Sequence, residues 1–177
     1  MNILVLSGSP RKNGNTQIMT AEFIKGAREA GHNVTEFNAG TMNIHPCIAC
    51  ESCLKNDGKC FRQDDMQKIY PAVEESDMIV FASPIYWYSL TAQIKSAIDR
   101  LYAFLLKGFK IKCSALLLNA HDSSPDVFNT AISNYNQIIT YAGWENKGII
   151  TVSGMEFKGA MNSAHELKDV YELGRTL

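Results

Sequence analysis

The chain begins with MNILVLSGSPRKNGNTQ, residues 1–17, and this stretch decides its fold class. The run from Ile3 to Leu6 is entirely apolar, as expected of a central parallel strand that is buried on both faces. A loop of small residues follows, from Ser7 to Thr16, and a helical pattern begins after it. Strand, small-residue loop and helix N-terminus in this order are typical of a phosphate-binding loop, and we expect Asn15 or Thr16 to cap the helix.

The same loop lacks the signatures of two well-known nucleotide sites. A Walker loop needs glycine, four residues and then Gly-Lys-Ser/Thr, whereas five residues separate Gly8 from Gly14 and Asn15 stands in the lysine position. The dinucleotide fingerprint Gly-x-Gly-x-x-Gly is also missing, because Pro10 and Arg11 interrupt it. A bound monophosphate is therefore expected rather than a triphosphate that is cleaved.

Composition excludes several classes of protein. The 17 basic and 18 acidic residues nearly cancel, which argues against nucleic acid or an anionic membrane surface as a partner. No apolar run is long enough to span a membrane, and the N-terminus does not read as a signal peptide. We expect one domain over residues 1–177, located in the cytoplasm, where thiols stay reduced.

Predicted strands and helices alternate along the whole chain, which indicates a doubly wound parallel sheet. The predicted strands are residues 3–6, 32–37, 77–82, 113–118 and 144–152. The predicted helices are a first one that Gly31 ends, a short one over 66–75 interrupted or restarted at Pro71, and further ones over 91–106, 125–141 and 160–177. Ligands of such sheets bind beyond the carboxyl ends of the strands, so the loops 7–16, 83–90 and 119–124 are the candidate binding loops.

The loop after the third predicted strand carries three consecutive aromatic residues in the sequence SPIYWYS, residues 83–89. Aromatic side chains at this edge of the sheet can stack on a planar ring or enclose it. The alternative is that Trp87 and Tyr88 pack on a neighbouring helix or on a second subunit. A planar ring joined to a monophosphate, bound across the switch point between the first and third strands, fits FMN.

Three segments resemble the NADPH-dependent FMN reductase and flavodoxin-like flavoprotein family. GSPRKNGNT (8–16) is similar to its phosphate loop, SPIYW (83–87) to its isoalloxazine loop, and QIKSAIDR (93–100) to the helix that follows. The match extends from residue 1 to about residue 105. The resemblance implies a flavodoxin-like three-layer α/β sandwich whose five-stranded parallel sheet has the order 2-1-3-4-5.

The resemblance also implies roles for individual residues. It assigns five side chains to the phosphate, namely Ser9, Arg11, Asn15, Thr16 and Gln17. It places Pro84, Ile85, Tyr86 and Trp87 along the flavin ring, with their backbone N–H groups near its polar edge. In the third loop Asn119, His121 and Asp122 stand where the family usually has a small loop with glycine, so Asn119 and His121 are expected at the second edge of the ring.

Four cysteines lie close together in the irregular segment 40–64, at Cys47, Cys50, Cys53 and Cys60. Their spacing resembles the cluster-ligating motif of iron–sulfur flavoproteins, a branch of the same family, and such a compact run can converge on a 4Fe–4S cluster. Zinc fits less well, because structural zinc sites separate two cysteine pairs by a longer loop. The remaining alternative is that the four thiols bind nothing. Cys113 lies in a predicted strand and is expected in the core.

No nucleophile has a partnered base, and no catalytic side chain is predicted, which suits an enzyme whose cofactor supplies the chemistry. We expect an FMN-dependent oxidoreductase that takes electrons from NAD(P)H and passes them to a quinone, a flavin or another small acceptor. One alternative is an electron carrier that receives electrons from a ferredoxin-like donor through a 4Fe–4S cluster, and another is a module that senses the redox state of FMN. Because no inserted subdomain covers the flavin, a homodimer or homotetramer is expected.

Overall fold

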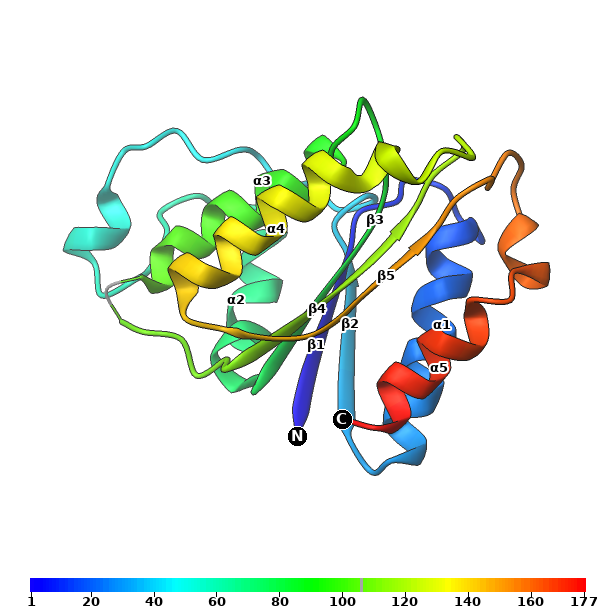
Figure 1. The fold of residues 1–177 in the computed structure, drawn as a ribbon. Helices are drawn as coiled ribbons and strands as arrows, with labels where there is room; N and C mark the ends of the chain where they lie inside the picture. The colour runs from blue at the N-terminus through cyan, green and yellow to red at the C-terminus, as the bar shows by residue number, and fades with distance from the viewer. Residues whose placement is uncertain (106) are drawn as a thin grey trace.

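The computed structural model describes residues 1–105 and 107–177, and a five-stranded parallel sheet lies at its centre (Figure 1). The spatial order of the strands is β2-β1-β3-β4-β5, which confirms the predicted flavodoxin-like topology. Every neighbouring pair in the sheet is parallel. The strands are β1 (Asn2–Ser7), β2 (Asn33–Asn38), β3 (Met78–Pro84), β4 (Cys113–Asn119) and β5 (Glu145–Val152).

Helices cover both faces of the sheet. Figure 1 shows α1 and α5 on one face and α2, α3 and α4 on the other. The α-helices are α1 (Asn15–Glu29), α2 (Met66–Glu75), α3 (Ala92–Arg100), α4 (Asn129–Ala142) and α5 (Leu167–Arg175). Four short 3₁₀ helices accompany them, η1 (Ser52–Lys55), η2 (Leu101–Phe104), η3 (Pro125–Phe128) and η4 (Ala160–Ser163). In the described residues no helix is both long and apolar enough to cross a bilayer.

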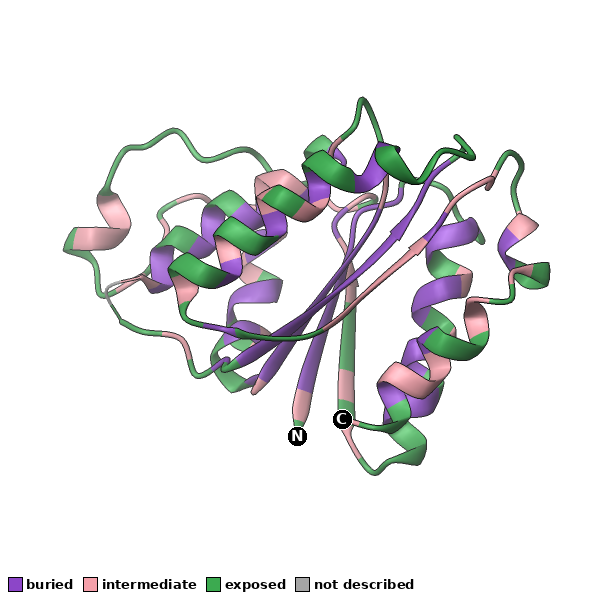
Figure 2. Cartoon of the chain, viewed as in Figure 1, coloured by how far each residue is buried: buried purple, intermediate pink, exposed green. Residues whose placement is uncertain are grey.

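Side chains of each central strand alternate between two hydrophobic cores, because successive residues of a strand point to opposite faces. In β1, Ile3 and Val5 join the core under α1 and α5, whereas Leu4 and Leu6 join the core under α2, α3 and α4. Figure 2 shows the central strands buried along most of their length. The continuous apolar run at the start of the chain is thus explained by burial on both sides.

Three segments that were each predicted as one helix contain two helices in the structure. The segments predicted as helices over 91–106, 125–141 and 160–177 each contain both a 3₁₀ helix and an α-helix, and residues 164–166 separate the two in the last segment. The predicted end at residue 106 lies outside the described residues. The predicted break at Pro71 was wrong, since α2 continues through it. Pro71 is on the exposed side, so its missing N–H costs one helical hydrogen bond while Ile69 and Val73 remain packed in the core.

Helices α1 and α5 lie in unusually close contact at two glycines. A Cβ atom at Gly26 would lie 2.1 Å from the carbonyl oxygen of Tyr171, and one at Gly174 would lie 2.3 Å from that of Phe23. Any larger side chain at these positions would push the helices apart. Because α1 begins at the candidate phosphate loop, this packing also positions the start of α1 relative to the sheet.

Candidate functional site

A cavity of about 300 Å³ lies at the carboxyl ends of the strands, at the switch point between β1 and β3 where the strand order reverses. Its lining comes from four separate loops and includes most of the residues predicted to bind a cofactor. The lining residues are Ser9, Arg11, Asn15, Thr16, Pro84, Ile85, Tyr86, Asn119, His121, Met155, Glu156 and Lys158. Two of the predicted residues, Gln17 and Trp87, are not among them.

The loop after β1 is pressed between the ends of two neighbouring strands. The N–H of Gly8 donates to the carbonyl of Ala82 (2.8 Å), and the hydroxyl of Thr91 donates to the carbonyl of Gly8 (2.8 Å). A Cβ atom at Gly8 would lie 2.6 Å from the Thr91 Oγ1, and one at Gly40 would lie 2.4 Å from the carbonyl oxygen of Ser9. These contacts hold the candidate phosphate loop against the start of α3.

The first turn of α1 has no side-chain cap, so the predicted capping by Asn15 or Thr16 was wrong. Gly14 is the N-cap residue. The Asn15 side chain is used elsewhere, since its amide donates to the carbonyl of Phe157 (2.9 Å) and accepts from the N–H of Gly159 (2.9 Å). Within the described chain no acceptor takes the backbone N–H groups of residues 15–17. The positive end of the helix dipole is therefore open toward the cavity.

Two buried hydroxyl groups beside this helix end accept hydrogen bonds but donate none among the described residues. Thr16 is 1% exposed, and its Oγ1 accepts from the side-chain amide of Asn119 (2.8 Å). Ser9 is 5% exposed, and its Oγ accepts from the N–H of Arg11 (3.3 Å). Since a hydroxyl group is both donor and acceptor, each O–H remains free to donate to an anion in the cavity.

Gln17 shapes the loop and does not line the cavity. Its side-chain oxygen accepts from the N–H of Asn13 (2.7 Å), and Asn13 has a positive φ of 51°. Asparagine tolerates this left-handed conformation better than most residues. The amide of Gln17 therefore stabilises the turn that leads into α1.

The aromatic residues after β3 form a tight turn. The N–H of Tyr86 donates to the carbonyl of Ser89 (3.0 Å), and the N–H of Ser89 donates back to Tyr86 (3.1 Å). The two residues between them, Trp87 and Tyr88, have φ values of 48° and 62°. This is the geometry of a type I′ turn, which normally uses Asn and Gly because bulky side chains are strained at positive φ. Strain of this kind is a frequent mark of functional sites.

The side chain of Trp87 is 95% exposed, so packing against a helix of its own chain is excluded. The backbone N–H groups of Ile85 and Tyr86 are also committed, to the carbonyls of Asn119 and Ser89. These two N–H groups, expected near the polar edge of the flavin ring, are therefore already hydrogen-bonded within the chain. The side chain of Tyr86 is 43% exposed and forms part of the cavity wall.

The loop after β5 supplies three lining residues that the sequence analysis missed, Met155, Glu156 and Lys158. The loop is held in place by the N–H of Met155, which donates to the carbonyl of Ala120 (2.8 Å), and by the N–H of Gly154, which donates to that of Asp122 (2.9 Å). The sequence did contain a signal for this loop. It follows the fifth predicted strand, and the carboxyl ends of all parallel strands lie at the same edge of the sheet.

The four clustered cysteines surround a second cavity of about 330 Å³, away from the first. Cys47, Cys50, Cys53 and Cys60 all line it, together with Arg62 and Arg100. All four thiols are free, and no three potential ligands in residues 1–105 and 107–177 converge on one point as in a formed metal site. A hydrogen bond with Ser52 lowers the pKa of Cys50, whereas burial raises the pKa of Cys53. Cys113 is buried in β4, as predicted.

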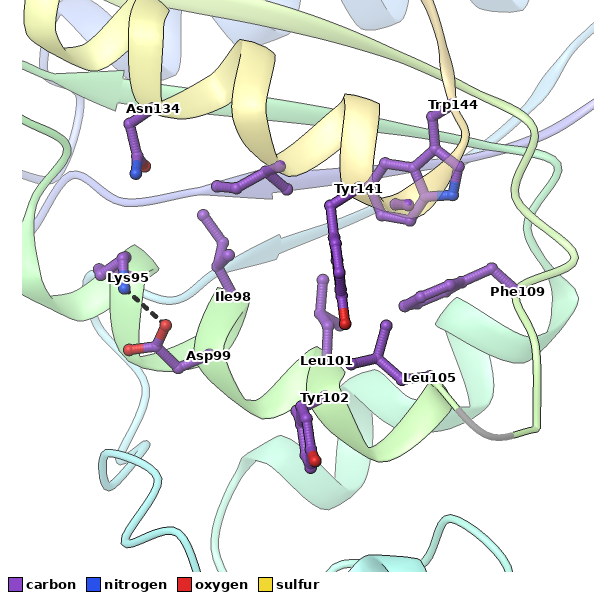
Figure 3. Close-up of a pocket in the computed structure, with 12 residues that line it drawn as sticks. Lys95, Ile98, Asp99, Leu101, Tyr102, Leu105, Phe109, Asn134, Tyr141 and Trp144 are labelled. Atoms are coloured by element: carbon purple, nitrogen blue, oxygen red, sulfur yellow. Dashed lines mark hydrogen bonds and ion pairs between the residues drawn. The ribbon is translucent and has the colours of Figure 1, made fainter.

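A third hollow of about 260 Å³ separates α3 from α4 and is mostly apolar. Figure 3 shows Tyr141 reaching from the end of α4 toward Leu101 and Leu105, with Phe109 and Trp144 beside it. Its polar groups are few, and the ion pair between Lys95 and Asp99 lies at one end. This composition is typical of a surface that packs against another apolar surface.

The chain belongs to the NADPH-dependent FMN reductase family, which it matches over residues 1–176. It is 36% identical over 104 residues to an iron–sulfur flavoprotein of Archaeoglobus fulgidus, which covers 59% of this chain and 47% of that protein. Another iron–sulfur flavoprotein of the same organism is 28% identical over 170 residues, 96% of this chain and 85% of the relative. The chain spans about half the length of the first relative.

Among solved structures, the chain resembles an NAD(P)H:quinone oxidoreductase from Methanothermobacter marburgensis with a TM-score of 0.73. The two chains are 19% identical, and the similarity covers 99% of this chain and 95% of the other. At this level of identity the likeness demonstrates the shared fold.

The strained turn leads to a first prediction. Replacing Trp87 by Asn and Tyr88 by Gly should raise the free energy of unfolding by about 1–3 kcal/mol, because each left-handed non-glycine residue costs about 1–2 kcal/mol. Urea denaturation measures the change. Tyr86→Gly is the matched control, since Tyr86 has no positive φ and its replacement should destabilise the chain. An unchanged or lower stability of the double variant would show that the turn is not strained.

Proposed function

We propose that residues 1–177 form one FMN-binding domain and that the protein is an oxidoreductase that takes electrons from NAD(P)H and passes them to a quinone, a free flavin or another small acceptor. The observation that carries this proposal is the open N-terminus of α1 flanked by the free hydroxyl groups of Ser9 and Thr16. A helix end with free N–H and O–H donors is suited to a phosphate group. Membership of the NADPH-dependent FMN reductase family supports the same assignment.

Each part of the cavity has a separate task in this proposal. Ser9, Thr16 and the first N–H groups of α1 would hold the phosphate, and the cationic side chains of Arg11 and Lys158 lie at the same cavity. The wall that includes Tyr86 would pack against the ring. FMN, when bound, accepts a hydride from NAD(P)H and releases its electrons to a second acceptor. The chain itself binds, orients and shields the cofactor.

Asn119 has a positioning role toward the phosphate. Its side-chain amide donates to the Thr16 oxygen and so directs the Thr16 hydroxyl hydrogen away from Asn119. Asn119 is the last residue of β4 and is 4% exposed, so its position is set by the sheet. His121 lies further along the same loop, at the rim of the cavity.

Thr16→Val tests the phosphate site. The loss of one hydrogen bond to a charged group costs about 1.5–3 kcal/mol, so the Kd for FMN should rise about 10- to 100-fold. Quenching of flavin fluorescence measures the Kd. Riboflavin, which lacks the phosphate, should bind the variant and the original chain equally, and Thr16→Ser should retain FMN affinity. Equal losses for FMN and riboflavin would contradict the assignment, as would a failure of the original chain to bind FMN.

We propose a second function for the cysteine cavity, in which a 4Fe–4S cluster on Cys47, Cys50, Cys53 and Cys60 lets the protein receive electrons from a ferredoxin-like donor. Such a cluster, when bound, takes up and releases one electron at a time. The donor set favours it: four free thiols line one cavity, and in the part of the chain that the structure describes the buried Nε atoms of its lining residues Arg62 and Arg100 have no acceptor. The names of the iron–sulfur flavoprotein relatives agree with this choice.

Iron analysis separates the two functions. Protein purified without oxygen should contain about four iron and four sulfide ions per chain, and Cys60→Ser should lose most of both while keeping FMN. Cys113→Ser is the control, because Cys113 is buried in β4 and should not affect iron content. A yellow protein with FMN and no iron after anaerobic reconstitution would reject the carrier and leave the reductase.

We also propose that the protein is cytoplasmic and forms a homodimer or homotetramer, with the groove between α3 and α4 as a contact surface. Tyr141 is 78% exposed at this groove (Figure 3), and Trp87, in the turn between β3 and α3, is 95% exposed. Tyr141→Glu should reduce the mass measured by light scattering toward that of one chain, because it places a charge on an apolar contact. Ala21→Glu, on the exposed side of α1, should leave the mass unchanged. A wild-type chain that is monomeric at high concentration would contradict the proposal.

A further inference from the structure

A buried ion pair lies outside the candidate flavin site. It joins Arg100, at the end of α3, to Asp64, the last residue of the cysteine-rich segment (residues 40–64). Both side chains are 2% exposed. Arg100 Nη1 donates to Asp64 Oδ2 and also to the carbonyl of His45 (3.3 Å). Asp64 in turn accepts from the N–H groups of His45 (3.0 Å) and Met66 (3.1 Å). The pair therefore ties α3 to both ends of the cysteine-rich segment.

Asp64 is held in its charged form. Burial alone would raise the pKa of Asp64, but the Arg100 guanidinium and the His45 N–H outweigh burial and keep that pKa below its usual value. A buried carboxylate and guanidinium with this many partners form a rigid pair, because breaking it would leave an uncompensated charge. Arg100 is thus fixed in orientation at the cavity of the four thiols.

The other side of the Arg100 guanidinium faces that cavity. Its Nη2 donates to the Cys60 sulfur (3.5 Å), while its Nε is buried and has no acceptor among the described residues. Arg62, on the same lining, also has a buried Nε without an acceptor. The Tyr70 ring lies 5.9 Å from the Arg100 guanidinium carbon, and the buried Tyr70 hydroxyl interacts with Arg100 and Cys60. Buried donors are normally satisfied, so unsatisfied ones beside one group of thiols indicate a missing acceptor.

We propose that Arg100 is a positioning residue for the four-cysteine site: it holds the Cys60 sulfur in place and directs N–H donors toward the anionic sulfur groups of a metal–thiolate centre. The proposal rests on the second function proposed above, in which the four cysteines bind a cluster. Donors of this kind orient thiolate ligands and stabilise the more negative, reduced form of a centre. Arginine suits the task because its planar fork can reach Asp64, His45 and Cys60 together.

The position of Arg100 also links the two cavities. Helix α3 begins next to Thr91, which contacts Gly8 in the phosphate loop, and ends at Arg100. Nine residues at about 1.5 Å each span roughly 13 Å, so one short rigid element would set the geometry between flavin and thiol cavity. Figure 1 shows the cysteine-rich segment extending beyond this layer of helices.

Removing Arg100 alone would leave Asp64 buried without a partner, so the test uses the double variant Arg100→Met/Asp64→Asn. The N–H of His45 donates to Asp64 Oδ2 and that of Met66 to Asp64 Oδ1, so asparagine, which has one oxygen, keeps one of these two hydrogen bonds. Arg100→Lys keeps the charge without the planar fork. Lys95→Met is the matched control, since it removes a cation from α3 outside the thiol cavity. Unfolding curves and FMN titration establish that each variant is folded.

The probe for the metal-free protein is Cd²⁺, whose binding to thiolates is followed by ultraviolet charge-transfer absorbance. The original chain and Lys95→Met should engage four thiolates, whereas the double variant should bind Cd²⁺ about 10- to 100-fold more weakly and lose the contribution of Cys60. Arg100→Lys should fall between them. In protein reconstituted with iron and sulfide, the double variant should have a more negative midpoint potential than the original chain.

The outcomes separate the proposals. Equal Cd²⁺ affinity, thiolate count and potential in the double variant and the original chain would overturn the role of Arg100, as would a Cd²⁺ site in the original chain that does not include Cys60. If the Cd²⁺ results hold but iron and sulfide do not assemble, the role of Arg100 in a thiolate site stands and the cluster function fails. A failure to bind FMN alone would affect only the reductase.

Discussion

The hydrogen bond from the Thr91 hydroxyl to the Gly8 carbonyl joins the two loops on which the candidate flavin site depends. It brings the start of α3 against the loop after β1, and a side chain at Gly8 would collide with both Thr91 and Ile94. The N–H of Gly8 extends the pairing with β3 by bonding to Ala82. Without this close approach the phosphate loop and the aromatic turn would not lie on one cavity.

The start of α1 leaves its first N–H groups without a side-chain cap and also anchors a distant loop through Asn15. Its first N–H groups stay unpaired, although a side-chain cap is typically worth about 1 kcal/mol of stability. The residue suited to such a cap, Asn15, instead holds the loop after β5, from Phe157 to Met161. The same amide thus leaves the helix end available to an anion and shapes the opposite wall of the cavity.

Helix α3 connects the aromatic turn at its start to the cavity of the four thiols at its end. Its first turn follows the strained aromatic turn, and its last residue, Arg100, is buried at the cavity of the four thiols. Asp99 and Tyr102 line both that cavity and the apolar groove toward α4. Three surfaces of different chemistry therefore meet along one short helix, which couples their positions.

Much of the architecture followed from local patterns. The apolar run of β1 and the alternation of strands and helices were enough to predict a doubly wound parallel sheet. The sheet order and most of the residues that line the cavity were predicted from the family resemblance that the two loop motifs carry. The helix cap was predicted wrongly because a side chain binds a distant segment: Asn15 was expected to cap α1, whereas its amide binds the loop after β5. The amide of Gln17 binds Asn13 within its own loop. The contribution of Lys158 was missed because it lies far along the chain from either motif.

The sequence by itself determined the fold class, the phosphate-type loop and the presence of four closely spaced thiols, since each of these depends on residues that are neighbours in the chain. Only the tertiary structure decided which donors remain free, that Trp87 and Tyr88 occupy a strained turn, and that Arg100 lies beside Cys60. These features depend on the register of β1, β3 and β4 and on the packing of α3. Both are set by burial of the whole sheet, which no short segment specifies alone.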